Sequence, residues 1–130
     1  MALLLLCSIT ASAYDFEVNG IYYKITDEVQ KTVYVTRGVK EYTGDIIIPE
    51  SVTYNNVIYS VTGITYIQKD NGYSSDDGAF SGCYGLTSIS IPNSVKKIGC
   101  YTFWGCRGLR NIEIPNSIVS IEAGAFYKCI

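Results

Sequence analysis

The sequence predicts a mainly β solenoid, in which short coils of chain stack on one another, preceded by a β-hairpin cap. Three observations predict it. The second half of the chain repeats with a period of 23 residues, each repeat holds one alternating apolar segment, and the first half shows hairpin signals without that period. The chain has 130 residues, the size of one domain, so we expect a single folded unit.

The first 13 residues predict a secretory signal peptide. A run of leucines from Leu3 to Leu6 is followed by Ala11-Ser-Ala13, a small-residue pattern typical of signal cleavage. The run is shorter than the roughly 20 apolar residues that span a bilayer, so we expect no transmembrane segment. Because no Lys or Arg precedes it, we expect the start of the signal to be clipped. The alternative is an N-terminal strand buried in the fold.

Residues 14–45 carry strand signals and predict the N-terminal β cap. Asn19-Gly20 separates Phe16-Glu-Val18 from Ile21-Tyr-Tyr-Lys-Ile25, and Asn-Gly between such runs is a strong hairpin signal. A third apolar run covers 32–36. A solenoid exposes apolar surface at its ends, so an atypical terminal module is expected there.

Residues 46–130 are predicted to form the stacked turns, with an insertion in the first of them around 53–77. Ile48-Pro49 and the following Ser-Val repeat the pattern at Ile91-Pro92, but the two prolines are 43 residues apart. We place the extra residues in a hairpin about Asn55-Asn56 and in a polar loop over 68–78. Asn tolerates the left-handed backbone that such a hairpin turn needs.

The complete turns repeat with little variation in their apolar positions. One strand per turn is expected where apolar and polar residues alternate, over 86–91 and 109–114, and the following proline should end it. The chain stops one residue after the third repeated cysteine, so we expect truncation at the C-terminus. Residues that are 23 positions apart and occupy equivalent places in successive turns form the columns of the repeat: Phe80, Phe103 and Phe126; Cys83, Cys106 and Cys129; Leu86 and Leu109; Ile89 and Ile112; Pro92 and Pro115.

The repeat Ala-Phe-x-Gly-Cys-x-x-Leu-x-x-Ile-x-Ile-Pro-x-Ser-Val-x-x-Ile, over 79–98 and with small changes over 102–121, resembles the BspA-type leucine-rich repeat. The resemblance covers roughly 45–130, and the stretch 16–25 is similar to the leader module of such proteins in Bacteroidetes. It implies a leucine-rich-repeat solenoid in a secreted or cell-surface protein that binds or adheres to protein ligands. The enlarged first turn and the small number of turns depart from the pattern.

Composition excludes several classes of function. The chain has no histidine, so catalytic triads and imidazole metal sites are absent. The net charge is −2 with both signs interspersed, which argues against nucleic acid as a partner. No phosphate-binding glycine motif follows a predicted strand. We therefore expect a non-enzymatic protein without a cofactor.

Four cysteines follow the signal sequence: Cys83, Cys100, Cys106 and Cys129. Three of them recur with the repeat, where a small residue fills the core of each coil, so we favour buried free thiols. A single bridge between neighbouring turns, joining Cys83 to Cys106 or Cys106 to Cys129, is the alternative. A zinc site is disfavoured because the spacing is unlike that of zinc-binding motifs.

The predicted polar loop holds oxygen ligands that suit calcium, at Asp70, Asn71, Asp76 and Asp77. Their spacing matches neither the EF-hand nor the glycine-rich calcium repeat, so we favour a solvated loop and no metal. Paired carboxylates also serve glycoside hydrolases, but adjacent residues in a polar loop rarely hold the separation that this chemistry needs.

Candidate binding residues follow from strand alternation. Side chains that alternate with the inward-facing isoleucines must point outward, and these are Ser88, Ser90, Asn111 and Glu113. Trp104 and Arg107 are added because they lie near the corner of the coil, with Tyr84 and Tyr127, and such residues are enriched at interfaces. The alternative is that these side chains are merely solvated.

Three functions compete on the sequence alone. We favour a secreted or surface module that binds a protein of the host or of another microbe, or a glycan. The second is a purely structural repeat spacer for a domain beyond the C-terminus. The third, a hydrolase, would depend on Asp76 and Asp77, and we expect no turnover.

Overall fold

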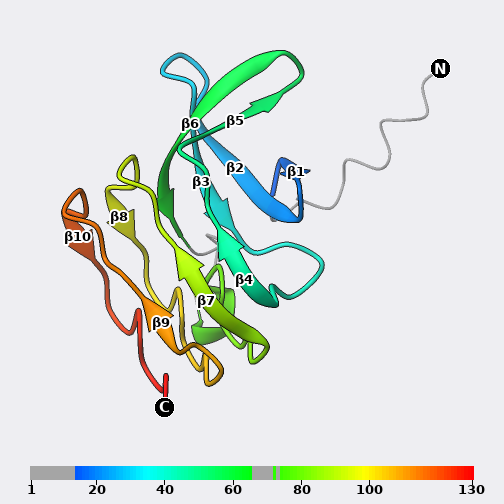
Figure 1. Cartoon of the computed structure of the whole chain (residues 1–130). Helices are drawn as coiled ribbons and strands as arrows, with labels where there is room; N and C mark the ends of the chain where they lie inside the picture. Colours follow the sequence, from blue (N-terminus) through cyan, green and yellow to red (C-terminus); the bar gives the residue numbers. More distant parts are fainter. Residues whose placement is uncertain (1–13, 66–71, 73) are drawn as a thin grey trace.

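The computed structural model describes residues 14–65, 72 and 74–130 (Figure 1). The predicted signal sequence, residues 1–13, lies outside the described residues, as does most of the predicted polar loop, at 66–71 and 73. The described part of the chain is mainly β, with ten strands, one short 3-10 helix and no α-helix. None of its helices is long and apolar enough to cross a membrane.

The chain begins with an antiparallel meander of three strands, β1 (Phe16–Val18), β2 (Ile21–Asp27) and β3 (Thr32–Thr36). The turn between β1 and β2 is formed by Asn19 and Gly20, whose φ angles are 51° and 84°. Asn and Gly are the residues that adopt this left-handed conformation most readily. The predicted hairpin at this position is confirmed.

A second hairpin is formed by β5 (Ser51–Tyr54) and β6 (Val57–Ile64). Asn55 and Asn56 connect them with φ angles of 50° and 63°, so the predicted turn is confirmed. Strand β6 also pairs in parallel with β3, which was not predicted. Strands from both predicted segments, 14–45 and 46–130, therefore share one sheet.

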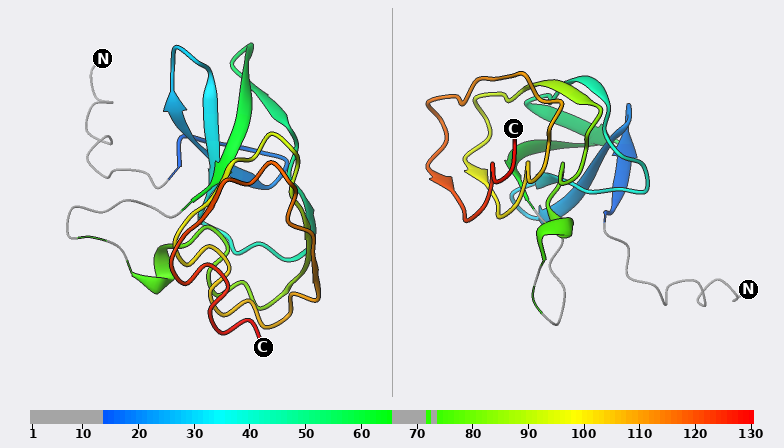
Figure 2. Two further views of the ribbon diagram at one scale, coloured as in Figure 1. Left: turned by 90° about the vertical axis from the view of Figure 1, so that its left-hand side faces the viewer. Right: turned by 90° about the horizontal axis from the view of Figure 1, so that it is seen from below.

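The repeated turns extend two parallel ladders, one on each side of the coil (Figure 1). The first ladder contains β4 (Gly44–Ile47), β7 (Leu86–Ser90) and β9 (Asn111–Ile112). The second joins β6 to β8 (Lys97–Ile98) and β10 (Ser120–Ile121). Figure 2 shows the yellow, orange and red segments following the same path beside one another.

The expectation of one strand per turn is wrong, because each turn contributes two. After the proline, Lys97 and Ile98 pair with β6, and Ile98 is buried, whereas the equivalent Ile121 of the next turn is 49% exposed. The turns are close enough for backbone hydrogen bonding on both sides of the coil, so any extended stretch there pairs with its neighbour. The predicted strand over 109–114 is shorter than expected, since β9 covers only Asn111–Ile112.

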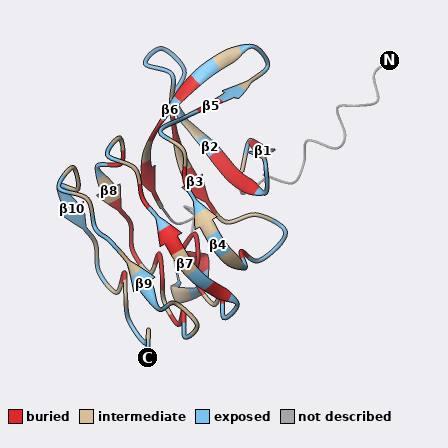
Figure 3. Cartoon of the chain, viewed as in Figure 1, coloured by how far each residue is buried: buried red, intermediate tan, exposed pale blue. Residues whose placement is uncertain are grey.

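A column of stacked aromatic rings forms the core of the turns. The ring centroids of Phe80 and Phe103 lie 5.3 Å apart, and those of Phe103 and Phe126 lie 5.2 Å apart. Tyr42 continues the column toward the N-terminal strands, 4.5 Å from Phe80. Figure 3 shows buried residues in β2, β3, β6 and β7, while β10 is exposed. One continuous core therefore joins the N-terminal strands to the repeated turns.

Candidate functional site

A groove of about 590 Å³ runs along the outward face of the first parallel ladder. We call this surface the strand groove. Strands β4, β7 and β9 supply its floor, so its shape is fixed by backbone pairing rather than by loops. Its lining residues are Asp45, Ile46, Ile47, Ser88, Ile89, Ser90, Ile91, Asn111, Ile112 and Glu113.

All four residues predicted from strand alternation line the strand groove. The parallel register places Ser88 beside Asn111, with Ser90 one outward position further along β7. Glu113 lies beyond the end of β9, one residue past Ile112, yet it remains exposed and lines the groove. Because side chains alternate along a strand, outward residues of neighbouring turns form rows across the ladder.

Asp45 belongs to the same row and was missed as a candidate. Strand pairing sets it opposite Ser88. Its carboxylate accepts hydrogen bonds from the Ser88 hydroxyl at 2.7 Å and from the Thr87 hydroxyl at 2.9 Å. These two bonds, the Ser88 bond first, hold the pKa of Asp45 below its usual value. Aligning Ile48-Pro49 with Ile91-Pro92 would have identified Asp45 as the equivalent of Ser88.

The strand groove is acidic and lacks a cation. Asp45 and Glu113 are its charged residues, and no Lys or Arg lines it. Serine hydroxyls and the Asn111 amide supply the remaining polar groups, while isoleucine side chains form its apolar part. This arrangement can accept hydrogen bonds and positive charge from a bound molecule, but it contains no paired nucleophile and base.

The other two predicted residues, Trp104 and Arg107, lie elsewhere, at the corner of the coil before the strands. The Arg107 guanidinium lies 5.9 Å from the centre of the Tyr84 ring. The Lys128 ammonium lies 5.7 Å from the centre of the Trp104 ring. The predicted site residues are therefore divided between two places, and the structure does not bring all six together.

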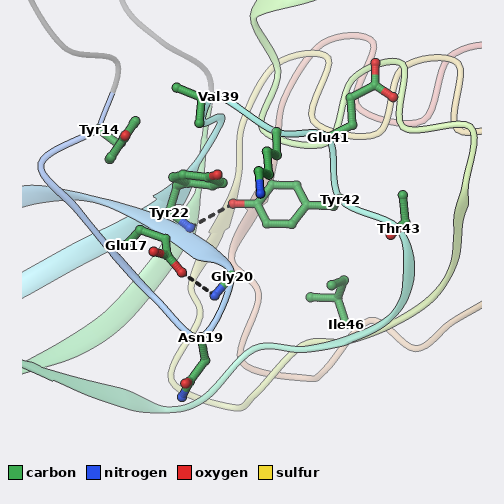
Figure 4. A pocket seen from close by; sticks show the side chains of 11 residues that line it. Tyr14, Glu17, Asn19, Gly20, Tyr22, Val39, Glu41, Tyr42, Thr43 and Ile46 are labelled. Carbon is green, nitrogen blue, oxygen red and sulfur yellow. Dashed lines mark hydrogen bonds between the residues drawn. The ribbon is translucent and has the colours of Figure 1, made fainter.

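A second cavity, of about 510 Å³, lies between the β1–β2 turn and the segment before β4 (Figure 4). Tyr42 forms its inner wall, and the Tyr42 hydroxyl accepts a hydrogen bond from the Tyr22 amide at 3.0 Å. The same hydroxyl donates to the Thr36 carbonyl at 2.7 Å. Burial is the main cause of the raised pKa of Tyr42. The Tyr42 hydroxyl therefore stabilises the fold, because both of its hydrogen bonds are made to the backbone.

The cysteines of the described residues are free thiols, and of the three repeated ones Cys83 and Cys106 are buried as predicted, whereas Cys129 is only half-buried; Cys100 is buried too. The Cys106 thiol donates to the Phe80 carbonyl at 3.0 Å, and the half-buried Cys129 thiol donates to the Phe103 carbonyl at 2.8 Å. Burial raises the pKa of Cys106 to about 12. Thiols of this kind stay protonated at neutral pH and are poor nucleophiles.

The candidate calcium ligands do not form a site within the part of the chain that the structure describes. Asp70 and Asn71 lie outside it. Asp77 is buried at the end of a 3-10 helix, η2 (Ser75–Asp77), and accepts a hydrogen bond from the Ser74 amide at 2.7 Å. Among described residues, no group of three or more potential metal ligands comes together. Asp77 therefore caps a helix instead of lying free in a polar loop.

The repeat region identifies the family. Residues 73–130 match the family described as BspA type leucine-rich repeat region (6 copies). The chain is a BspA-type leucine-rich-repeat protein. Its mainly β leucine-rich-repeat fold agrees with a solved leucine-rich repeat protein from Bacteroides ovatus, at 36% identity and a TM-score of 0.74. That match covers 89% of this chain and 27% of the Bacteroides chain.

Two further solved structures resemble this BspA-type protein. A leucine-rich cell surface protein from Faecalibacterium prausnitzii is 24% identical, with a TM-score of 0.66, over 88% of this chain and 28% of that one. The leucine-rich repeat protein of T. pallidum is 25% identical, with a TM-score of 0.65, over 88% of this chain and 46% of that one. The chain thus spans less than half of each of these three proteins. No curated protein matches it.

Proposed function

We propose that this BspA-type protein is an exported, non-catalytic binding module that holds a partner protein in the strand groove. In this proposal residues 1–13 direct export, residues 14–45 cap one end of a solenoid, and residues 46–130 present the binding face. The partner is a protein on the surface of a host cell or of another microbe. The observation that supports the proposal best is that Ser88, Ser90, Asn111 and Glu113 share one groove with Asp45.

Rigidity and chemistry both support binding at this groove. Its floor is a parallel ladder in register, so its outward side chains have fixed spacing and lose little conformational freedom on binding. The exposed Ile47 offers apolar area to bury, and the charges of Asp45 and Glu113 favour a positively charged partner. A partner that presents basic and hydrogen-bond-donating side chains suits this surface.

We also propose that the protein catalyses no reaction. The chain has no histidine, and the pKa of Cys106, raised to about 12, keeps that thiol protonated. Leucine-rich repeats of the matching family suit recognition, because their solvent-facing positions can vary without disturbing the core.

A matched pair of arginine substitutions tests the proposal. Asn111→Arg fills the centre of the strand groove with a long cation, while Asn93→Arg makes the same change at an exposed turn outside it. Both variants and the unmodified chain would be applied to an array of purified extracellular-matrix and bacterial surface proteins. We expect at least one array protein to bind the unmodified chain and Asn93→Arg, and to lose about tenfold or more in affinity for Asn111→Arg.

Two outcomes would contradict binding through the strand groove. In one, no array protein binds the unmodified chain. In the other, every protein that binds it also binds Asn111→Arg with equal affinity, which would move the interface to another surface.

A structural spacer is the second candidate, favoured by one observation: the chain covers only 27% of the Bacteroides ovatus protein. In that case the groove would be incidental. Reading the gene beyond Ile130 separates the two, since an appended catalytic or anchoring domain favours the spacer and further repeats alone favour binding.

A further inference from the structure

Five side chains gather at the corner of the coil, on three successive turns. We call them the cationic corner: Tyr84, Trp104, Arg107, Tyr127 and Lys128. Arg107 follows the core cysteine of its turn, as Tyr84 does one turn earlier. Tyr127 follows the core phenylalanine of its turn, as Trp104 does one turn earlier. None of the five lines the strand groove.

The two cations of this corner have aromatic contacts and no anionic partner. Lys128 lies over both Trp104 and Tyr127, with its ammonium 5.6 Å from the centre of the Tyr127 ring. Arg107 lies over Tyr84. Within the described residues neither cation has a hydrogen bond or an ion pair, and the rings of Tyr84 and Tyr127 are each 59% exposed. Ring contacts orient the cations without neutralising them.

Lys128 occupies a backbone position that disfavours a side chain. Its φ is 62°, and the equivalent residues of the two preceding turns are glycines with similar angles, Gly82 at 71° and Gly105 at 70°. A residue with a Cβ is less favourable than glycine in this region of φ. The backbone conformation alone therefore favours glycine here, and the lysine adds a charge that the two preceding turns lack at this position.

The local charge is opposite to that of the rest of the molecule. The three segments that carry the corner residues, 78–85, 101–108 and 123–130, contain no Asp or Glu, although the whole chain has a net charge of −2. The strand groove carries Asp45 and Glu113 and no cation. One protein thus presents an acidic surface and a basic one, at different positions of the same repeats.

The polar groups of the corner are mostly donors. A guanidinium, an ammonium, an indole N–H and two phenol hydroxyls require a ligand rich in oxygen acceptors and negative charge. The backbone at this corner is already used, because the Gly82 amide donates to the Trp104 carbonyl at 2.8 Å and the Gly105 amide donates to the Tyr127 carbonyl at 2.9 Å. These two glycine amides are therefore not available to a ligand.

From these observations we propose that the cationic corner binds an acidic polysaccharide. Its carboxylate or sulfate groups meet Arg107 and Lys128, and its hydroxyls accept from the phenol and indole groups beside them. A single-stranded nucleic acid fits less well, because base stacking uses open ring faces and a cation already lies over the rings of Tyr84 and Trp104. This site is independent of the partner protein proposed for the strand groove.

Two variants that cannot harm the fold test the proposal. Lys128→Gly restores the residue of the two preceding turns, and Arg107→Gln changes an exposed side chain. Lys31→Gly is the matched control, because Lys31 is also an exposed lysine with a positive φ, of 57°, in the turn before β3. Affinity would be measured for heparin and polygalacturonate as acidic polysaccharides, for dextran as a neutral one, and for poly-glutamate and oligo-thymidylate.

We expect the unmodified chain and Lys31→Gly to bind at least one acidic polysaccharide and not dextran. The double variant Arg107→Gln/Lys128→Gly should lose about tenfold or more in that affinity, because it removes both cations that meet the ligand's anionic groups. Asn111→Arg should keep it, which separates this site from the strand groove.

Three results would overturn the proposal. The first is no binding to either acidic polysaccharide, and the second is equal binding by the double variant. The third is equal or tighter binding of poly-glutamate or oligo-thymidylate, which would show ion exchange or another class of partner. Since the whole chain is acidic, its net charge cannot produce retention on heparin.

Discussion

In the N-terminal part of the molecule, residues 14–65, strand β2 has seven residues and β6 has eight. In the repeated turns, residues 79–130, strands β9 and β10 have two residues each. In the N-terminal part, tight turns at Asn19-Gly20 and Asn55-Asn56 set the register of antiparallel pairs. In the repeated turns, strands so short cannot set a register alone, and the stacked column of Phe80, Phe103 and Phe126 does it instead.

The two parts therefore tolerate amino-acid substitutions at different positions. Local turn chemistry controls the first part, so its register depends on a few asparagines and glycines. Side-chain stacking controls the second, so its solvent-facing positions are free to vary. The two parts meet where the Tyr42 ring contacts Phe80, and Tyr42 also bonds to Tyr22 and Thr36 of the N-terminal strands.

The largest effect is expected from removing a ring of the column. Phe103 is fully buried between two other phenylalanines, so Phe103→Ala should lower the free energy of unfolding by about 3–5 kcal/mol. Urea denaturation measures the loss, and hydrogen exchange should place it mainly in 79–130. Tyr127→Ala, at an exposed ring, should stay within about 0.5 kcal/mol. Equal losses in the two variants would mean that the column does not organise the turns.

A smaller effect is expected at the junction of the two parts. Tyr42→Phe keeps the ring contact with Phe80 but leaves the Tyr22 amide and the Thr36 carbonyl without their partner, at a cost of about 1–3 kcal/mol. The matched control is Tyr34→Phe, whose hydroxyl has no hydrogen bond in the structure. Thermal unfolding that leaves Tyr42→Phe as stable as this control would show that the hydroxyl does not couple the two parts.

The last effect, absent at neutral pH, is a pH dependence that originates in the repeated turns. Burial raises the pKa of Cys106 from its usual 9.0 to about 12 in the folded state. The unfolded chain therefore loses this proton first, and the stability that the protonated thiol contributes is present below pH 9 and is lost as pH rises toward 12. The free energy of unfolding should fall less steeply above pH 9 in Cys106→Ala than in the unmodified chain. Parallel curves would contradict this origin.

Local signals account for what the sequence could predict. Both asparagine turns and the inward-facing columns were predicted because each depends on residues close together in the chain or on a fixed period. The row of Ser88 and Asn111 followed from alternation along a strand. These are the parts of the fold and of the candidate site in which short-range chemistry decides the structure.

Pairing between distant segments could not be predicted in the same way. Strand β3 pairs in parallel with β6, although nothing in either segment indicates its partner. Strands β8 and β10 belong to the second ladder, although their residues carry no strong strand signal. Asp45 was missed because 43 residues separate Pro49 from Pro92, which hid its equivalence to Ser88. Trp104 and Arg107 were placed at the corner correctly, but their separation from the strand groove depends on three-dimensional packing.

The hydrogen bonds from cysteine thiols to the preceding turn affect how the gene of such a protein can gain or lose repeats. Cys106 reaches back to the Phe80 carbonyl and Cys129 to the Phe103 carbonyl, so these two turns donate to their predecessors in the same way. A duplication or deletion of one whole 23-residue unit would leave these donors with equivalent acceptors. Whole units can therefore be added or removed without losing the hydrogen bonds that join one turn to the next.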